Sequence, residues 1–492
     1  MTIKAWRLTW AAPMFMPAVA LAVGILAGQH VEMSTCWLLF LSLLVCAVLL
    51  YCWPRCQSVA LLLSVAALGA IRSSSVRGDF ERTVWPDGVV SCEAVVVSEV
   101  VEKPKTMATD VVVSSGQKLK CYIAKDTASQ LLTIGDRLQL RSHIEGNREW
   151  RQGTFDYRRY QEVHGFKGQM FVRQGCWQLL DRSWDGLPVW QRLRLSFLDY
   201  RHRLLQRYRQ AGFSGDEYAV VAAMTLGDKS AMSHELKEVY AVSGASHVLA
   251  LSGLHLGIVY MVLSLLVVGR RWRFVTQLLA VLGIWAFALL VGLPASVVRS
   301  AVMITVYGLL SLAHRGHPSL NALALASLLI LVVSPYSLFD VGFQLSFAAM
   351  LAILTVQPVI SGVVGRQWLM EYSVVRWLWG LATVSVAAQV GTAPLVAYYF
   401  GRFSTWFLLT NFVVIPATTV ILWLAIATLA VPALGAVLLR VVGWLNGVLT
   451  LLATRLPCPS IEGLHPTVVQ TVAVYVVVLG LLVIVLKYDK RI

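Results

Sequence analysis

Long apolar runs separated by short polar connections make up most of this chain. Runs long enough to cross a hydrocarbon layer, about 20 helical residues, occur at 10–29, 36–53 and 57–71 and recur from residue 247 to residue 486. We therefore expect a polytopic α-helical membrane protein with about ten or eleven spans. The first run is expected to be retained, because no small-residue cleavage site precedes a soluble domain.

A different pattern fills residues 80–182, where spanning runs stop and apolar residues alternate with polar ones. This alternation is typical of half-buried strands, and it is clearest in SCEAVVVSEV, ATDVVVSS, KLKCYIAK, GDRLQLRSHIE and KGQMFVRQ. We expect an inserted external small β-barrel domain of the OB-like type. Such barrels commonly bind single-stranded nucleic acid, but a plain scaffold fits the nearly balanced charge of this segment equally well.

The stretch 187–211, LPVWQRLRLSFLDYRHRLLQRYRQA, predicts a basic amphipathic helix between the barrel and the later spans. One interpretation is an interfacial helix that lies on lipid headgroups. The other is that its arginines face a polyanion such as DNA; they are Arg192, Arg194, Arg201, Arg203, Arg207 and Arg209. The chain then divides into about three N-terminal transmembrane helices at 1–72, the barrel at 80–182, this helix, and a multi-span domain at 212–492.

Composition and charge support a membrane location and suggest an orientation. Hydrophobic residues make up 57% of the chain and charged residues 14%, which is too apolar for a soluble protein of this length. The net charge is +15, and much of it sits in short segments around Lys4 and Arg7, at 269–273, at 314–317 and at 487–492. Because short cytoplasmic loops collect Lys and Arg, we expect both termini in the cytoplasm and the barrel outside.

Cysteine usage and missing motifs limit the chemistry. Cys92, Cys121 and Cys176 lie in the predicted barrel, and in an oxidising compartment we expect a disulfide between Cys92 and Cys121 on neighbouring strands. The cysteines and histidines show no zinc-type spacing, so we expect no metal and no cofactor. No GxxxxGK[ST] loop occurs, so any driving force must come from partners or gradients.

Four polar clusters interrupt the later spans, at 227–257, 292–300, 334–350 and 388–416. Polar side chains and broken helices at membrane depth are tolerated where they are packed in protein or line a wet cavity. We expect these clusters to line a channel through His247, Ser252, His255, Arg299, Asp340, Gln344, Gln389 and Asn411. Each residue also has a structural alternative. Arg299 could extend to the membrane interface, Asp340 could cap a helix N-terminus, and the two histidines could pack in the protein core.

The predicted lining favours an anion or a neutral polymer over a cation, because few carboxylates are present. Two other functions stay open. One is a carrier for a small anion or a lipid-linked precursor. The other is an intramembrane hydrolase in which Ser252 is the nucleophile and His255 the base, although the sequence shows no third orienting group.

Five ordered blocks of the chain resemble the ComEC family of bacterial inner-membrane DNA-uptake proteins. They are GDKSAMS, HVLALSGLHLG, VVRSAVM, SPYSLFDVGFQLSFAAM and APLVAYYFGRFSTWFLLTNFVVIP, and FDYRRYQEVHGFKG resembles the end of that family's N-terminal OB-like domain. The resemblance implies a multi-pass inner-membrane channel that admits single-stranded DNA to the cytoplasm during natural transformation. It also implies membrane lipid, an envelope DNA receptor and a cytoplasmic helicase-like ATPase as partners.

The chain departs from many members of that family in one respect. These members end in a metallo-β-lactamase-like domain with a dense His and Asp motif, whereas HxHxDH is absent from this sequence. We therefore expect a short form that is not an enzyme, and a separate nuclease that degrades the second strand.

Overall fold

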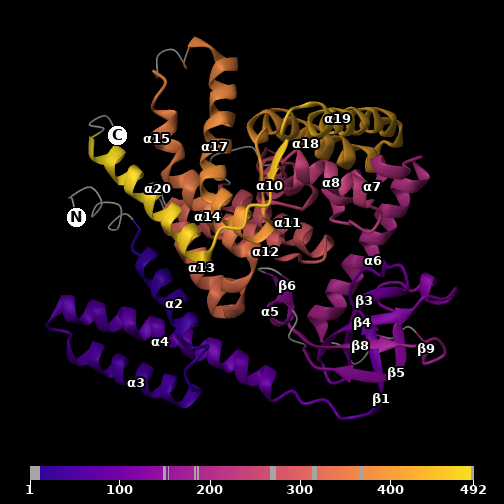
Figure 1. The fold of residues 1–492 in the computed structure, drawn as a ribbon, viewed down its shortest axis with the longest axis horizontal. Coiled ribbons are helices and arrows are strands. Elements are labelled where there is room, and N and C mark those ends of the chain that lie inside the picture. The colour runs from indigo at the N-terminus through magenta and orange to yellow at the C-terminus, as the bar shows by residue number, and fades with distance from the viewer. Residues whose placement is uncertain are drawn as a thin grey trace.

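The structure is a computed structural model that describes residues 12–488 except 148–150, 153–154, 182–183, 185–187, 266–272, 313–318, 366–368 and 370. Lys4, Arg7, the loops around 269–272 and 314–317, Arg366 and the last four residues, on which the predicted orientation depends, lie outside the described residues. Figure 1 shows the N-terminal helices and the barrel beneath a larger helical domain.

The N-terminal unit contains α2 (Phe15–Ala27), α3 (Met33–Leu49) and α4 (Pro54–Glu81). Helix α4 packs against both of the others. The approach of α2 to α4 needs glycine, because a Cβ on Gly24 would overlap the backbone carbonyl of Ala66. Most side chains of α3 are exposed and apolar, as expected for a helix surrounded by lipid.

The predicted barrel is confirmed. Five strands follow the order β1 (Val89–Val96), β3 (Thr106–Val113), β4 (Lys118–Ala124), β8 (Phe166–Val172), β5 (Arg137–Glu145), and pairing of β5 with β1 closes the barrel. Only the β4–β8 pair is parallel among these five. This order is the OB-type Greek key. Alternate residues of β4 point inward, so Leu119, Cys121 and Ile123 are fully buried.

Smaller elements decorate the barrel. Strand β2 (Val101–Glu102) pairs with β3, and β9 (Trp177–Leu180) pairs with β5. The β4–β5 connection holds η1 (Ser129–Leu131), and the β5–β8 connection holds β6 (Arg151–Gln152), β7 (Phe155–Asp156) and α5 (Tyr157–Val163). Asp156 caps α5 by accepting a hydrogen bond from the Arg159 amide at 3.0 Å.

The adjacency assumed for the Cys92–Cys121 disulfide is wrong. Strand β3 lies between β1, which holds Cys92, and β4, which holds Cys121. Both are free thiols that pack in the same barrel core. Burial raises the pKa of each thiol, so neither is prone to become a thiolate.

The basic helix forms as predicted, as α6 (Val189–Gln210), and part of its apolar surface packs against protein. Its first half packs Leu195 and Leu198 against Val95, Val97, Val112 and Ile134 of the barrel. Its second half packs Leu204, Leu205 and Tyr208 into the core of the helical domain. Protein therefore covers these residues, whereas Val189, Trp190, Leu193 and Tyr200 of the same helix are exposed.

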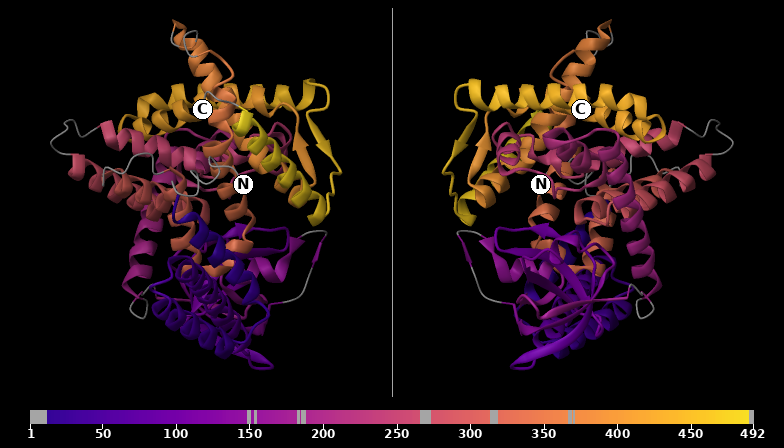
Figure 2. Two further views of the ribbon diagram at one scale, coloured as in Figure 1. Left: turned by 90° about the vertical axis from the view of Figure 1, so that its left-hand side faces the viewer. Right: turned by 90° about the vertical axis from the view of Figure 1, so that its right-hand side faces the viewer.

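The helical domain begins with α7 (Gly215–Leu226), whose middle is completely buried. Around it pack α6, α8 (His234–Val242), α18 (Phe407–Ala430) and α19 (Gly435–Arg455). The remaining elements are α9 (Ser246–Leu249), α10 (Gly253–Leu265), α11 (Arg273–Leu290), α12 (Ala295–Leu312), α13 (Ser319–Val333), η3 (Pro335–Phe339), α14 (Val341–Thr355), α15 (Gln357–Ser361), α17 (Ser373–Phe400), β10 (Arg402–Ser404), η4 (Pro432–Leu434), β11 (Ser460–Glu462) and α20 (Val468–Tyr488). Figure 2 shows α17, α18 and α19 at the end of the molecule opposite the barrel.

The helices define a multi-pass membrane protein. Over the described residues, six helices are long and apolar enough to cross a membrane by length and composition, and six more are apolar but shorter, at 10–17 residues. The run at 247–268 is not one continuous span. It is divided between α9, which has 4 residues, and α10. This break lies in the first polar cluster, where the candidate site begins.

Candidate functional site

Helix α10 begins with a capping arrangement built from Ser252 and His255. The Ser252 amide donates to His255 Nδ1 at 3.2 Å, and the Ser252 hydroxyl lies 3.0 Å from the same nitrogen. Ser252 precedes the helix and His255 is its third residue, so the His255 side chain makes one of the two bonds of a capping box, in place of Glu or Gln. Because Nδ1 accepts from the backbone amide, the proton belongs on Nε2. That atom is buried and lacks a partner among the described residues.

The start of α10 lies against the first turns of α12. Ser296 Oγ donates to the Leu251 carbonyl at 2.8 Å, and a Cβ on Gly253 would lie 3.1 Å from Ser300 Oγ. Pro294 supplies the fixed φ that suits a helix start, and Leu293 before it has a φ of 58°. Two broken spans therefore begin side by side.

Arg299 connects α12 to the start of α14. Its Nη1 lies 3.1 Å from Asp340 Oδ2, and its Nη2 donates to Ser346 Oγ at 3.3 Å. Asp340 also caps α14, because its Oδ1 accepts from the Gly342 amide at 2.9 Å. Arg299 is 6% exposed, so it is enclosed by protein rather than extended to the membrane interface. The N-cap interpretation of Asp340 is confirmed.

Arg299 and Ser300 are adjacent in sequence and contact the starts of two different helices, so three helix N-termini meet around them. We call this group the three-helix junction; it consists of Ser252, His255, Ser296, Arg299, Ser300 and Asp340. Helix N-termini carry partial positive charge and unpaired amides. The Nε atom of Arg299 is also buried without a hydrogen-bond partner among the described residues. Two buried nitrogens of the junction, His255 Nε2 and Arg299 Nε, thus lack an acceptor among the described residues.

Of the other predicted lining residues, Gln344 lies one turn after Asp340, and its amide donates to the Asp340 carbonyl at 3.0 Å. Gln344 donates to the Leu338 carbonyl at 3.0 Å and accepts from Tyr399 at 2.8 Å, which joins α14 to α17. His247 is exposed on α9, and its Nδ1 lies 3.1 Å from the Gly244 carbonyl. Gln389 is half-buried on α17, and Asn411 on α18 has a buried Oδ1 with no partner among the described residues. Among the described residues, no hydrogen bond or ion pair joins Gln389 or Asn411 to the junction, whereas His247 is close enough to His255 for an electrostatic interaction.

The arginines of α6 make different contacts. Arg201 is 5% exposed and lies 3.6 Å from Glu99 of the barrel, whereas Arg194 donates to the Gly292 carbonyl before α12 at 3.2 Å. Burial raises the pKa of Glu99, and Arg201 only partly offsets this. Arg203 pairs with Asp199 at 2.6 Å, Arg209 lies over the Tyr218 ring, and Arg192 and Arg207 are exposed. Arg194 and Arg201 are therefore contacts between domains, not a DNA-facing surface.

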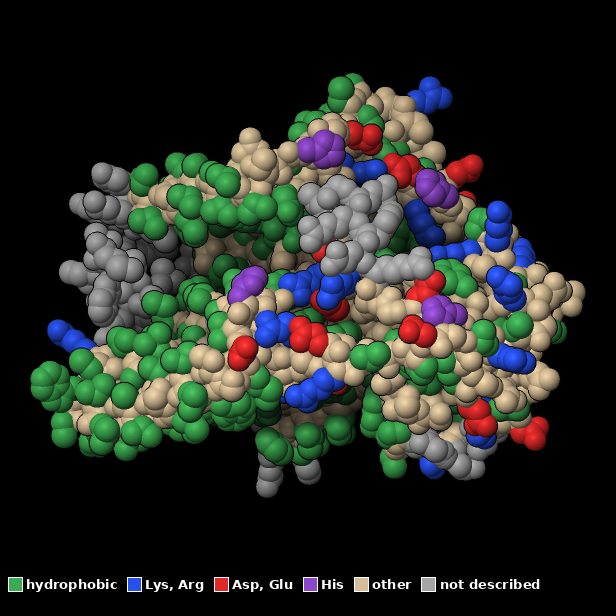
Figure 3. Space-filling model, turned by 60° about the horizontal axis from the view of Figure 1, so that its bottom comes forward, with side chains coloured by type: hydrophobic (Ala, Val, Ile, Leu, Met, Phe, Trp, Pro, Cys, Tyr) green, Lys and Arg blue, Asp and Glu red, His purple; other side chains and the backbone are tan. Residues whose placement is uncertain are grey.

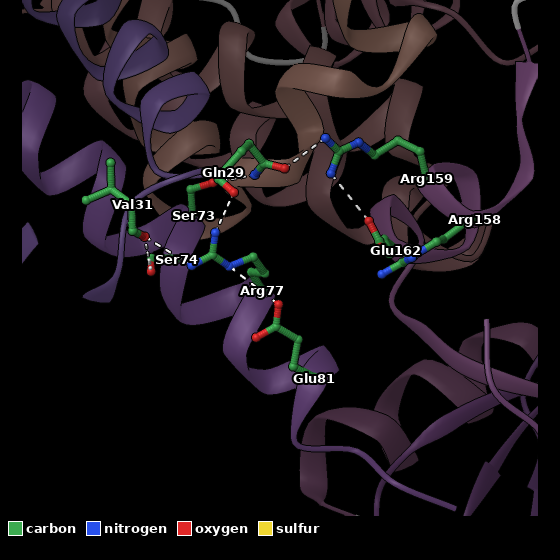
Figure 4. Close-up of polar contacts among 9 residues, drawn as sticks. All are labelled: Gln29, Val31, Ser73, Ser74, Arg77, Glu81, Arg158, Arg159 and Glu162. Carbon is green, nitrogen blue, oxygen red and sulfur yellow. Dashed lines mark hydrogen bonds and ion pairs between the residues drawn. The ribbon is translucent and has the colours of Figure 1, made fainter. Parts of the chain in front are cut away.

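A second polar group joins the N-terminal helices, the barrel and η3, and the sequence analysis did not assign it. Figure 3 shows basic and acidic side chains gathered beside the hydrophobic surface of the N-terminal helices, where a cavity of about 390 Å³ lies. Arg159 of α5 donates to Gln29 Oε1 at 2.8 Å and to Glu162 at 3.3 Å (Figure 4). Its guanidinium also covers the Phe339 ring at 4.0 Å.

Arg77 of α4 completes this group from the membrane side. It donates to the carbonyls of Gln29 and Val31 and lies 3.6 Å from Glu81 (Figure 4). These contacts hold the α2–α3 loop on α4. The block FDYRRYQEVHGFKG, which contains Arg159, was the available signal in the sequence, but no single-sequence pattern shows that its arginine reaches Gln29, 130 residues away.

Fold and site together define a multi-pass membrane protein with a polar junction of broken helices and a separate OB-like barrel. Residues 224–488 match the family model described as Competence protein. This match covers more than half of the chain, so the chain belongs to the competence protein family of the ComEC type. The matched part contains the whole three-helix junction.

Two relatives are similar to parts of this chain. The chain is 28% identical over 275 residues to ComE operon protein 3 of Bacillus subtilis (strain 168), an alignment that covers 54% of this chain and 32% of the relative. It is 29% identical over 235 residues to an uncharacterized protein of Aquifex aeolicus (strain VF5), covering 47% and 50%. The chain thus matches half or less of the length of each relative. No solved structure matches it.

Proposed function

We propose that this chain is an inner-membrane channel that imports single-stranded DNA into the cytoplasm during natural transformation. The observation that carries the proposal is the three-helix junction, which lies in the part of the chain that matches the competence family. Family membership supports a role in DNA uptake, and the residues of the junction support binding of an anionic backbone.

The junction suits a passing phosphodiester chain. Half-helix N-termini at membrane depth bind anionic groups through their amides and dipoles. Arg299 adds a full positive charge, and Asp340 neutralises it at rest at 3.1 Å. A phosphate that reaches Arg299 competes with a carboxylate already in place, so each binding event is weak. Weak, exchangeable binding is what conduction requires.

The proposal includes neither catalysis nor an internal source of energy. The sequence has no nucleotide-binding loop, so we assign the driving force to a cytoplasmic helicase-like ATPase, DNA delivery to an envelope receptor, and cleavage of the second strand to a separate nuclease. We place the barrel outside and both termini in the cytoplasm, because the basic residues in the short loops favour that orientation.

The test is import of duplex DNA labelled on one strand, scored as nuclease-protected label inside cells. Arg299→Ala should reduce protected label at least tenfold while surface-bound label stays the same. Arg440→Ala is the matched control, because Arg440 is an exposed arginine on α19 outside the junction. Normal import in Arg299→Ala cells, with wild-type amounts of protein in the membrane, would show that the junction does not line the path.

The second candidate is an intramembrane hydrolase, favoured by the 3.0 Å distance between Ser252 Oγ and His255 Nδ1. Against it, Nδ1 also accepts from a backbone amide, which is a sufficient structural role for the histidine. A hydrolase predicts that a serine-directed probe labels the wild type and not Ser252→Ala. A small-anion carrier, the third possibility, predicts anion uptake into proteoliposomes that contain this chain and no DNA.

A further inference from the structure

The face of the barrel that OB folds most often use for oligonucleotides is partly covered in this protein. That face comprises the second and third strands and the loops after the first and fourth strands. Here Leu195 and Leu198 of α6 cover Val112 of β3. The loop after β1 is held by the Glu99–Arg201 contact. The loop after β5 carries Arg159, which is bound to the N-terminal helices.

An open groove begins on the part of that face that α6 leaves uncovered, at Thr106 of β3 and at Tyr122 and Ala124 of β4. It crosses the outer surface of β1, β5, β8 and β4, is bordered by β9, and has a volume of about 1020 Å³. Strand β9 pairs with β5 only over Arg137–Leu140, and β8 pairs with β5 only at Ile144 and Glu145. The sheet therefore divides beside Arg141 and His143, and the groove widens there.

Stacked aromatic rings form one wall of this groove. Tyr122 and Phe171 are paired across the parallel β4–β8 ladder, with ring centroids 4.8 Å apart and planes 11° apart. Lys103 lies over the Tyr122 ring at 4.8 Å, so both faces of Tyr122 are covered. The ring of Phe171 is 50% exposed and presents the free face of the stack. Trp177 lies further along the groove.

The charges of the groove differ from those of the rest of the barrel. Elsewhere on the barrel several basic side chains are paired, as Lys118 and Lys120 with Asp110, Lys125 with Glu102, Arg137 with Glu93 and Lys167 with Asp79. In the groove Arg141 and Arg173 are exposed and form no ion pair with any residue that the structure describes. None of the described residues that line the groove is a carboxylate.

We propose that this groove binds single-stranded DNA, with a base stacked on Phe171 and the backbone phosphates at Arg141 and Arg173. The inference rests on the proposed function and extends it by assigning a binding surface outside the membrane domain. An aromatic platform beside unpaired cations is the combination that binds single strands with little sequence preference. A duplex fits less well, because its bases are not free to stack on the ring.

The experiment is fluorescence polarisation of the full chain in detergent with a labelled oligothymidylate of about 12 nucleotides. Phe171→Ala should weaken binding about tenfold or more, because stacking on an aromatic ring contributes strongly for each base. Arg141→Ala and Arg173→Ala should each make log Kd less dependent on log salt by about 0.7. The matched control is Tyr160→Ala, which removes an exposed ring of α5 outside the groove, and it should leave affinity unchanged.

Two results would overturn the proposal: wild-type affinity in Phe171→Ala, or weakened binding in Tyr160→Ala alone. Because Phe171 is half exposed, its replacement should leave the melting temperature of the chain close to that of the wild type. The two proposals fail separately. If the groove variants bind DNA normally but Arg299→Ala loses import, the groove proposal is rejected and the channel proposal stands. If Phe171→Ala loses DNA binding but Arg299→Ala imports DNA normally, the groove proposal stands and the channel proposal is rejected.

Discussion

At the scale of single residues, the three-helix junction depends on one buried ion pair. Arg299 and Asp340 have side-chain exposures of 7% and 19%, so each charge is largely removed from water and depends on the other. Removing one partner of such a pair is much more costly than replacing both, because it leaves an uncompensated charge. Function and stability are therefore linked at Arg299, and the two effects need separate measurements.

The first prediction concerns Asp340→Asn. Asparagine keeps the N-cap oxygen but removes the charge opposite Arg299, so unfolding in detergent should become easier by about 3 kcal/mol. The double variant Arg299→Met with Asp340→Asn should recover most of that loss. The matched control is Glu238→Gln in the exposed Arg402–Glu238 pair, 3.1 Å long, where less than about 1 kcal/mol is expected. Equal losses in Asp340→Asn and Glu238→Gln would contradict the buried-pair argument.

At the scale of elements, hydrophobic periodicity predicted whether a segment forms a helix or a strand. It predicted less well what packs against each face of that element. All five strand segments are confirmed, because a period of two places residues such as Leu119 and Ile123 inside the barrel. Periodicity also predicted α6, but it does not distinguish a helix face covered by lipid from one covered by protein. The order of strands is not readable from sequence spacing, so the pairing inferred for Cys92 and Cys121 used the wrong neighbours.

The break between α9 and α10 shows a similar limit for the site. Composition identified the polar residues there, but a single sequence does not show that Ser252 and His255 cap a helix. Nor does it show that Arg299 meets Asp340, 41 residues further on. Helix facing and long-range pairing come from packing, which a single sequence does not contain. Residue types could thus be predicted, and their grouping could not.

The second prediction belongs to α6 as a connecting element. Leu198 is buried against the barrel, and a Cβ on Gly292, before α12, would lie 3.0 Å from its side chain. Leu198→Ala should therefore lower the free energy of unfolding by about 2–4 kcal/mol. Leu193→Ala on the same helix is the control, because Leu193 is 48% exposed, and it should change stability little. Denaturant unfolding measures both losses, and equal losses in Leu198→Ala and Leu193→Ala would contradict the packing of α6 against the barrel.

At the scale of the whole molecule, three units meet at Arg159. Its guanidinium contacts Gln29 of the N-terminal unit and the Phe339 and Tyr336 rings of η3, while its backbone belongs to the barrel helix α5. The position of the barrel relative to the helical domain is thus fixed at two places, here and along α6. These contacts would hold the proposed DNA-binding groove in a constant position relative to the helical domain.

The last prediction follows from that arrangement. Arg159→Ala should loosen the barrel without unfolding it, so proteolysis between the barrel and the membrane helices should become faster while the barrel keeps its strand signal in circular dichroism. Arg159→Lys should not rescue the defect, because an ammonium group cannot both stack on Phe339 and bind Gln29 and Glu162 as the planar guanidinium does. Arg158→Ala is the neighbouring control, since Arg158 is more exposed and pairs with Glu162 on its own helix. Equal proteolysis rates in Arg159→Ala and wild type would mean that α6 alone holds the barrel in place.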